Sequence, residues 1–208
     1  MSNYDECFES IISFLRDNPD LLSWKSKKNI PDINTEEGVE VLRSKYISSR
    51  NSPISLGEPS TLVDPAVSQI LKIAKNYSDD ELKLISIEHQ YSMLAENMVG
   101  LLLEKYISLT LEKHGWVWCA GDFVKAVDFI KKNSNGKWEA VQVKNRSTTE
   151  NSSSSAIRNG TDIKKWFRMY SKSAKKRGNT NWDAFPEEEF VGLLSENAFF
   201  DFIKKQLE

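Results

Sequence analysis

One stretch of the chain, Val127–Arg146, constrains the fold and the chemistry more than any other. It reads VDFIKKNSNGKWEAVQVKNR, which is two short β-like runs around a polar NSNG turn. Alternate residues of a strand point to the same face, so Gln142 and Lys144 project together. If the two runs pair as a hairpin, Asp128 of the first run approaches that face. An acid, an amide oxygen and a lysine then meet at one edge.

These groups suit the hydrolysis of a phosphodiester, in which a bound Mg²⁺ polarises the phosphate and relieves the charge of the leaving group. Mg²⁺ prefers oxygen ligands and keeps several waters, so one or two carboxylates suffice. We expect Asp128, the amide oxygen of Gln142 and the carbonyl of Val143 to hold the ion. Lys144 is expected to orient the attacking water and stabilise the phosphate. Glu139 is rejected because it faces the other side of an unbroken strand.

A long helical pattern precedes the hairpin and offers a further carboxylate. It begins at Ser78, where Ser78 and Glu81 form a capping-box pattern, and continues to about His114. Glu96 and Glu104 lie two turns apart on it, and either side chain can point toward the sheet. We prefer Glu96 as a ligand, while Glu104 and a purely solvated helix face stay open.

The order of elements predicts the fold class. Helical patterns fill the first 77 residues, strands are expected over 116–120, 123–130 and 137–145, and helices over 161–170 and 187–207. This order indicates an α/β (α+β) fold with a central mixed β-sheet flanked by helices. At 208 residues we expect one domain, with a helical N-terminal subregion (1–77) and a catalytic core (78–208).

Charge is distributed unevenly along the chain. Residues 125–177 contain fourteen Lys or Arg and four Asp or Glu, whereas the whole chain has a net charge of −2. A solvated charged surface is one interpretation, but the excess adjoins the Asp128 cluster, which favours a face that binds a polyanion. There is no apolar run long enough to span a bilayer and no signal-peptide pattern, and Cys is rare. We therefore expect a cytoplasmic protein that binds no membrane.

A serine-rich run, STTENSSSSAIRNG, follows the central strand over residues 147–160. Low complexity of this kind is typical of a disordered linker. The same hydroxyl, guanidinium and amide groups are also those that contact DNA base edges and phosphates.

The pattern of Asp128 followed by Gln142-Val143-Lys144 resembles the active site of PD-(D/E)xK nucleases, in the variant with glutamine in place of the second acid. The wider stretch VKNRSTTENSSSSAIRNGTDIKKWFR is similar to type II restriction endonucleases of the SinI-like group, and the similarity covers roughly 96–182. The resemblance implies a restriction-endonuclease-like fold, metal binding by Asp128 and Gln142, and Glu96 as the helix carboxylate. Because Gln142 lacks the charge of an acid, the ion is expected to be held less tightly.

The resemblance also implies a prokaryotic source and a homodimer that cuts both strands of double-stranded DNA at a short, roughly palindromic site, G/C-rich with a central A/T pair. Eight residues are then candidate DNA contacts. Ser154, Ser155, Arg158 and Asn159 are candidate base or backbone readers, and Arg146, Lys164, Lys165 and Arg168 are candidate backbone contacts.

Two alternatives keep the DNA partner but change the function. One is a repair or modification-dependent nuclease of the same fold. The other is a non-catalytic DNA-binding module in which Gln142 marks a lost metal site. Both differ from a restriction enzyme in what they do to a plasmid in the presence of Mg²⁺.

Overall fold

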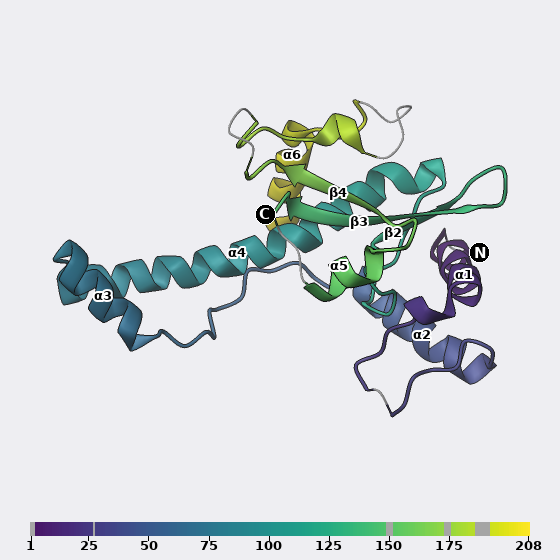
Figure 1. Ribbon diagram of the computed structural model, residues 1–208, viewed down its shortest axis with the longest axis horizontal. Coiled ribbons are helices and arrows are strands. Elements are labelled where there is room, and N and C mark those ends of the chain that lie inside the picture. The colour runs from purple at the N-terminus through teal and green to yellow at the C-terminus, as the bar shows by residue number, and fades with distance from the viewer. Residues whose placement is uncertain (1–2, 27, 149–151, 173–175, 186–191) are drawn as a thin grey trace.

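The protein is described by a computed structural model that covers all residues except 1–2, 27, 149–151, 173–175 and 186–191. A four-stranded sheet in the order β1-β2-β3-β4 lies at its centre. β1, β2 and β3 are antiparallel, and β4 pairs with β3 in parallel. The predicted mixed sheet flanked by helices is therefore confirmed (Figure 1). The elements are α1 (Asn3–Asp17), α2 (Glu36–Arg50), α3 (Pro65–Lys75), α4 (Asp79–Leu111), β1 (Val117–Trp118), β2 (Phe129–Lys132), β3 (Trp138–Arg146), α5 (Ser152–Arg158), β4 (Lys164–Met169) and α6 (Glu196–Leu207).

Helix α4 is the longest element and has 33 residues. It begins at the predicted capping box, in which Ser78 and Glu81 exchange hydrogen bonds. Its second half, from Leu102 onward, is largely buried, whereas its first half projects from the body together with α3 (Figure 1). Within the described residues, no helix combines the length and the apolar character needed to cross a membrane.

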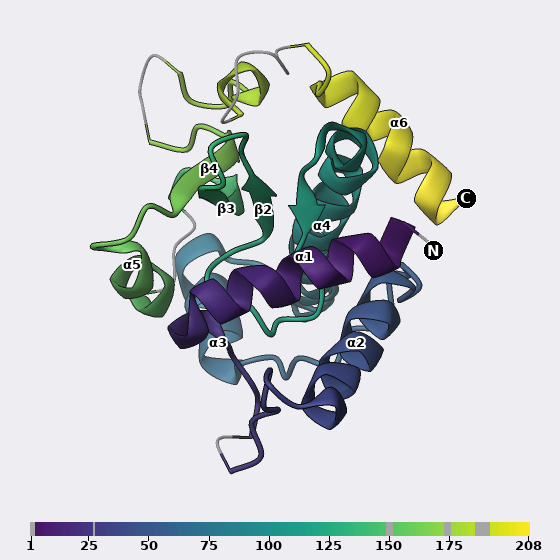
Figure 2. The same cartoon turned by 90° about the vertical axis from the view of Figure 1, so that its right-hand side faces the viewer.

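The core lies where α1, the second half of α4, the sheet and α6 meet. Figure 2 shows α4 between the sheet and α6, with α1 running across one end. Burying these side chains removes large apolar surfaces from water, which is the main term that favours folding. The largest fully buried side chains include Phe8, Phe14, Leu103, Trp116, Phe129 and Phe199.

The expected helix over 161–170 is wrong, because residues 164–169 form strand β4. Trp166 and Arg168 are buried on one face, as the alternation of a strand requires. Apolar residues at 163, 166, 167 and 170 also fit a helix, so local spacing misled the prediction. Pairing with β3, which is distant in sequence, determines the strand.

Two other expected boundaries move. The strand expected over 123–130 begins only at Phe129, since Ala126 has a φ of 55°, a left-handed conformation that interrupts extended backbone. The last helix begins at Glu196, where the side chain of Ser195 accepts the N–H of Ala198. The serine-rich run also departs from the linker interpretation, because residues 152–158 form α5.

Candidate active site

Asp128 is fixed by the sheet although it lies just before β2. Its N–H donates to the carbonyl of Val141 at 2.9 Å, and its carbonyl accepts the N–H of Cys119 at 2.9 Å. The register of β2 with β3 begins at Phe129 opposite Val141. The side chain of Asp128 accepts the N–H of Val143 at 2.6 Å, which places its carboxylate beside the backbone between Gln142 and Lys144. The hairpin therefore brings Asp128 next to the segment that carries Gln142 and Lys144, as the sequence analysis expected.

Gln142 occupies an unusual environment for an amide side chain. It is only 2% exposed, and its Oε1 atom has no hydrogen-bond partner within the described part of the chain. A buried acceptor without a partner costs about 1–3 kcal/mol. An amide oxygen held this way, beside a carboxylate, has the chemistry of a cation ligand.

The α4 carboxylate that the structure brings to Asp128 is Glu104. Glu104, Asp122 and Asp128 line one cavity of about 230 Å³. The indole N–H of Trp118 donates to Glu104 at 2.9 Å and holds its orientation. Glu96, the preferred residue in the sequence analysis, instead lies on the exposed face of α4 and pairs with Arg146 at 3.1 Å.

Burial raises the pKa of both carboxyl groups, and the charge of Asp128 adds to the shift of Glu104. Removal from water is the main cause that raises the pKa of Asp128, opposed by the hydrogen bond from Val143 and the charge of Lys144. Removal from water also raises the pKa of Glu104, followed by the negative charge of Asp128. The charge of Lys144 lowers the pKa of both acids, which indicates that the lysine lies near both. A divalent cation between these groups offsets the repulsion.

The fit to a divalent metal depends on mixed oxygen donors. Among the residues that the structure describes, no group of three or more His, Cys, Asp or Glu is arranged to hold a metal by itself. Hard cations such as Mg²⁺ accept carboxylate, amide and backbone carbonyl oxygens together with waters. Asp128 and Glu104 line one cavity and offer carboxylate oxygens. Gln142, whose Oε1 has no partner among the described residues, precedes the Val143 N–H that binds Asp128 and offers an amide oxygen, so the residue types present suit the ion.

Positive charge adjoins the same face through β4. Lys165 pairs with Gln142 in the parallel register, so the two side chains share a face of the sheet. Desolvation lowers the pKa of Lys165, and the charge of Arg158 at the end of α5 lowers it further. Two predicted DNA contacts thus come together beside Gln142.

The other predicted DNA contacts lie in different surroundings. Lys164 pairs with Glu139 at 3.0 Å on the exposed surface. Ser155 is half-buried in α5 and Asn159 is exposed just after it, whereas the side chain of Ser154 lies outside the described part.

Arg168 requires a correction. It was expected on a helix among phosphate contacts, but it lies in β4, is 7% exposed and pairs with Glu196. It also donates to Asn145 at 3.0 Å. Its guanidinium binds groups within the protein, because the alternation of side chains along β4 turns it toward α6.

Two residues of the site were missed by the sequence analysis. Trp118 orients Glu104, and Asp122 shares the cavity with Asp128. The only signal in the sequence was their closeness to the hairpin, because the approach of α4 to β1 cannot be read from local spacing.

Comparison with known proteins agrees with this chemistry. The profile of the SinI restriction endonuclease family matches residues 2–208. The type II restriction enzyme Eco47I of Escherichia coli is 46% identical over 202 residues, which cover 96% of this chain and 86% of that protein. The type II restriction enzyme SinI of Salmonella infantis is 41% identical over 204 residues, which cover 97% of this chain and 86% of that protein.

Proposed function

Since this chain belongs to the SinI restriction endonuclease family and is a type II site-specific deoxyribonuclease, we propose that it cuts DNA on the face that carries Asp128, Gln142 and Lys144. Type II restriction enzymes generally need a divalent metal, and Mg²⁺ is the ion we assign here. Asp128, Glu104, the amide oxygen of Gln142 and the carbonyl of Val143 would hold it. When bound, the ion supplies polarisation of the phosphate and relief of charge on the leaving oxygen.

Lys144 then acts on the water and the phosphate. It shares the face of Gln142, and its charge reaches both Asp128 and Glu104. A cation in this place orients the attacking water and stabilises the extra negative charge of the transition state. Lys165 and Arg158 extend the positive surface toward α5, where they are suited to hold neighbouring phosphates or read guanine.

The assembly and layout of the protein follow from the same function. Cutting both strands of a duplex with one active site per chain calls for two chains, so we propose a homodimer. We assign catalysis to residues 78–208 and a supporting role to residues 1–77 within a single domain. A cytoplasmic location stays a prediction, and it agrees with Cys7 and Cys119 being buried and forming no disulfide in the described residues.

The observation that carries the proposal is the buried Oε1 atom of Gln142, which has no partner among the described residues, next to the Val143 N–H that holds the carboxylate of Asp128. Plasmid DNA incubated with the protein and Mg²⁺ should give discrete fragments, and EDTA should abolish them. Asp128→Ala and Lys144→Ala should each slow cleavage by about 10³-fold or more while retaining duplex binding.

Glu139→Gln is the matched control, because Glu139 lies on β3 like Lys144 and pairs with Lys164 on the surface. It should cut at the wild-type rate. Wild-type cleavage by Asp128→Ala or Lys144→Ala would refute the residue assignment. Duplex binding without cleavage in either Mg²⁺ or Mn²⁺ would favour a non-catalytic binding module.

A further inference from the structure

Helix α3 and the first half of α4 form an arm that stands away from the sheet (Figure 1). This arm, residues 61–98, exposes many large apolar side chains. Leu62 is 94% exposed and Leu84 is 62% exposed. Eight large apolar residues are exposed within it, namely Leu62, Val63, Val67, Ile70, Ile73, Leu84, Ile87 and Met93. Such a concentration on a folded protein marks an interaction site.

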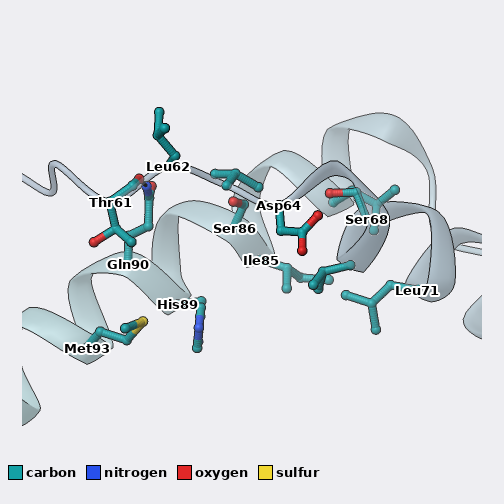
Figure 3. Close-up of a pocket in the computed structure, with 13 residues that line it drawn as sticks. Thr61, Leu62, Asp64, Ser68, Leu71, Ile85, Ser86, His89, Gln90 and Met93 are labelled. Carbon is teal, nitrogen blue, oxygen red and sulfur yellow. Dashed lines mark hydrogen bonds between the residues drawn. The ribbon is translucent and has the colours of Figure 1, made fainter.

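One side of α4 in the arm is covered by α3 and by the chain that leads into it. Between them lies a groove of about 340 Å³, whose lining includes Leu71, Leu82, Ile85 and Met93 (Figure 3). Leu62, just before α3, also lines this groove (Figure 3). The groove lies on one face of the hairpin of α3 and α4.

The opposite side of α4 carries a second apolar stripe. Its residues recur at intervals of three and four, and this spacing keeps them on one side of a helix. Leu84 and Ile87 at its outer end are exposed, whereas the side chains nearer the body are half-buried. The stripe is Leu84, Ile87, Tyr91, Leu94 and Met98, which contains no charged residue.

We propose that a second copy of this chain packs on the arm, so that two α3–α4 hairpins form a four-helix bundle that joins the dimer. Each partner in a stable interface buries about 800 Å², and the exposed Leu84 and Ile87 of α4 with Ile70 and Ile73 of α3 would supply the apolar centre of such an interface. A bundle of two hairpins gives each unpaired apolar face a partner. The proposal rests on the homodimer proposed above and adds where the two chains meet.

The function also sets the direction of packing. Ile87 lies 17 residues from Glu104 along α4, which is about 25 Å. Antiparallel packing centred on Ile87 would separate the two catalytic faces by roughly 50 Å, whereas a site of a few base pairs spans less than about 20 Å. The two-fold axis therefore runs along the arm, with both catalytic faces at the same end.

The test is the double variant Leu84→Asp/Ile87→Asp, compared with Leu109→Asp. Leu109 is 68% exposed on the same helix but outside the arm. Sedimentation equilibrium should show wild type and Leu109→Asp as dimers. The double variant should raise the dissociation constant of the dimer by about 100-fold or more. Circular dichroism should show a wild-type fold for both variants, because each substituted side chain is exposed in the single chain.

Leu94→Cys gives a second readout that depends on direction. In the parallel arrangement the two copies of residue 94 meet near the axis, so mild oxidation should give a covalent dimer, whereas antiparallel packing centred on Ile87 would hold them about 20 Å apart. Wild type, whose two cysteines are buried, should not give this product. A double variant that stays dimeric overturns the arm interface but leaves the homodimer and its nuclease activity intact. A monomeric wild type that still cuts both strands overturns the homodimer as well.

Discussion

The Oδ2 atom of Asp128 accepts a hydrogen bond from the backbone N–H of Val143 at 2.6 Å. This contact joins the carboxylate of one strand to the backbone of the next, at the point between Gln142 and Lys144. The bond fixes the side chain in place while the second carboxylate oxygen stays available. A substitution can therefore remove the charge of Asp128 while its side chain keeps the same position.

Asp128→Asn should keep the position and lose the charge. Its amide oxygen can still accept from Val143, so the free energy of unfolding without metal should equal or exceed that of wild type. Asp128→Ala leaves the Val143 N–H without its acceptor and should lower the free energy of unfolding by about 1–3 kcal/mol. Urea unfolding in EDTA measures both values. Equal stabilities of the two variants would show that the hydrogen bond contributes nothing.

Glu104→Gln and Glu96→Gln distinguish the two candidate helix carboxylates. Glu104→Gln keeps an acceptor for Trp118 but removes a charge from the cavity, and it should slow cleavage by about tenfold to 100-fold with a higher Mg²⁺ requirement. Glu96→Gln breaks only an exposed ion pair and should change stability by less than about 1 kcal/mol. Cleavage rates over a Mg²⁺ titration decide between them. Slower cleavage in Glu96→Gln but not in Glu104→Gln would support Glu96 as the helix carboxylate, as the sequence analysis preferred.

The raised pKa values of Asp128 and Glu104 predict how stability depends on pH. Above the ordinary carboxyl range and below the raised values, the folded protein binds more protons than the unfolded chain. The contribution of these groups to the free energy of unfolding therefore falls as the pH rises from about 5 to about 8. Urea unfolding in EDTA across this range measures the slope. Glu104→Gln should flatten it, whereas Glu96→Gln should not.

Gln142→Glu should couple stability to metal more strongly. A third acid beside Asp128 and Glu104 adds repulsion, so the free energy of unfolding without metal should fall by about 1–3 kcal/mol. Adding Mg²⁺ should restore more stability than it does in wild type, because the ion is held by one more charge. Thermal melts with EDTA and with Mg²⁺ test this. An identical Mg²⁺ response in both proteins would argue against Gln142 as a ligand.

Arg168→Ala should be a stability variant and not a DNA-binding variant. It leaves the carboxylate of Glu196 without the arginine, although Trp182 still donates to that carboxylate at 2.9 Å. Breaking a buried pair of this kind costs about 3–5 kcal/mol. Lys164→Ala, on the exposed surface of the same strand, should leave stability within about 0.5 kcal/mol. Denaturation and duplex binding at a temperature where both variants are folded separate the two effects.

The sequence predicted correctly the features that depend on neighbouring residues, namely helix caps, turns and the alternation of side chains along a strand. The cap at Ser78 accepts the predicted backbone N–H of Glu81, and the Asn133–Gly136 turn joins β2 to β3. The alternation of side chains brought Gln142 and Lys144 to one face. The resemblance to SinI-like restriction enzymes, taken from the same stretch, is confirmed by the family match.

What sequence reasoning missed depends on contacts between distant segments. Arg168 binds Glu196, which lies 28 residues further along the chain. The pairing of β4 with β3 produces a strand where the spacing of apolar residues fits a helix equally well. The choice between Glu96 and Glu104 rests on how α4 is rotated against β1, which the periodicity of α4 leaves undetermined.

Strands β3 and β4 lie side by side and run in the same direction, so the chain must return along the whole sheet between them. In the described part of that return, Ser147 donates its N–H to Met169 and residues 152–158 form α5. The DNA contacts proposed for α5 thus lie on a connection, whereas Gln142 and Lys144 lie within β3. On the proposed assignment, substitutions in α5 would alter contacts to DNA while the backbone that carries Gln142 and Lys144 stays in place.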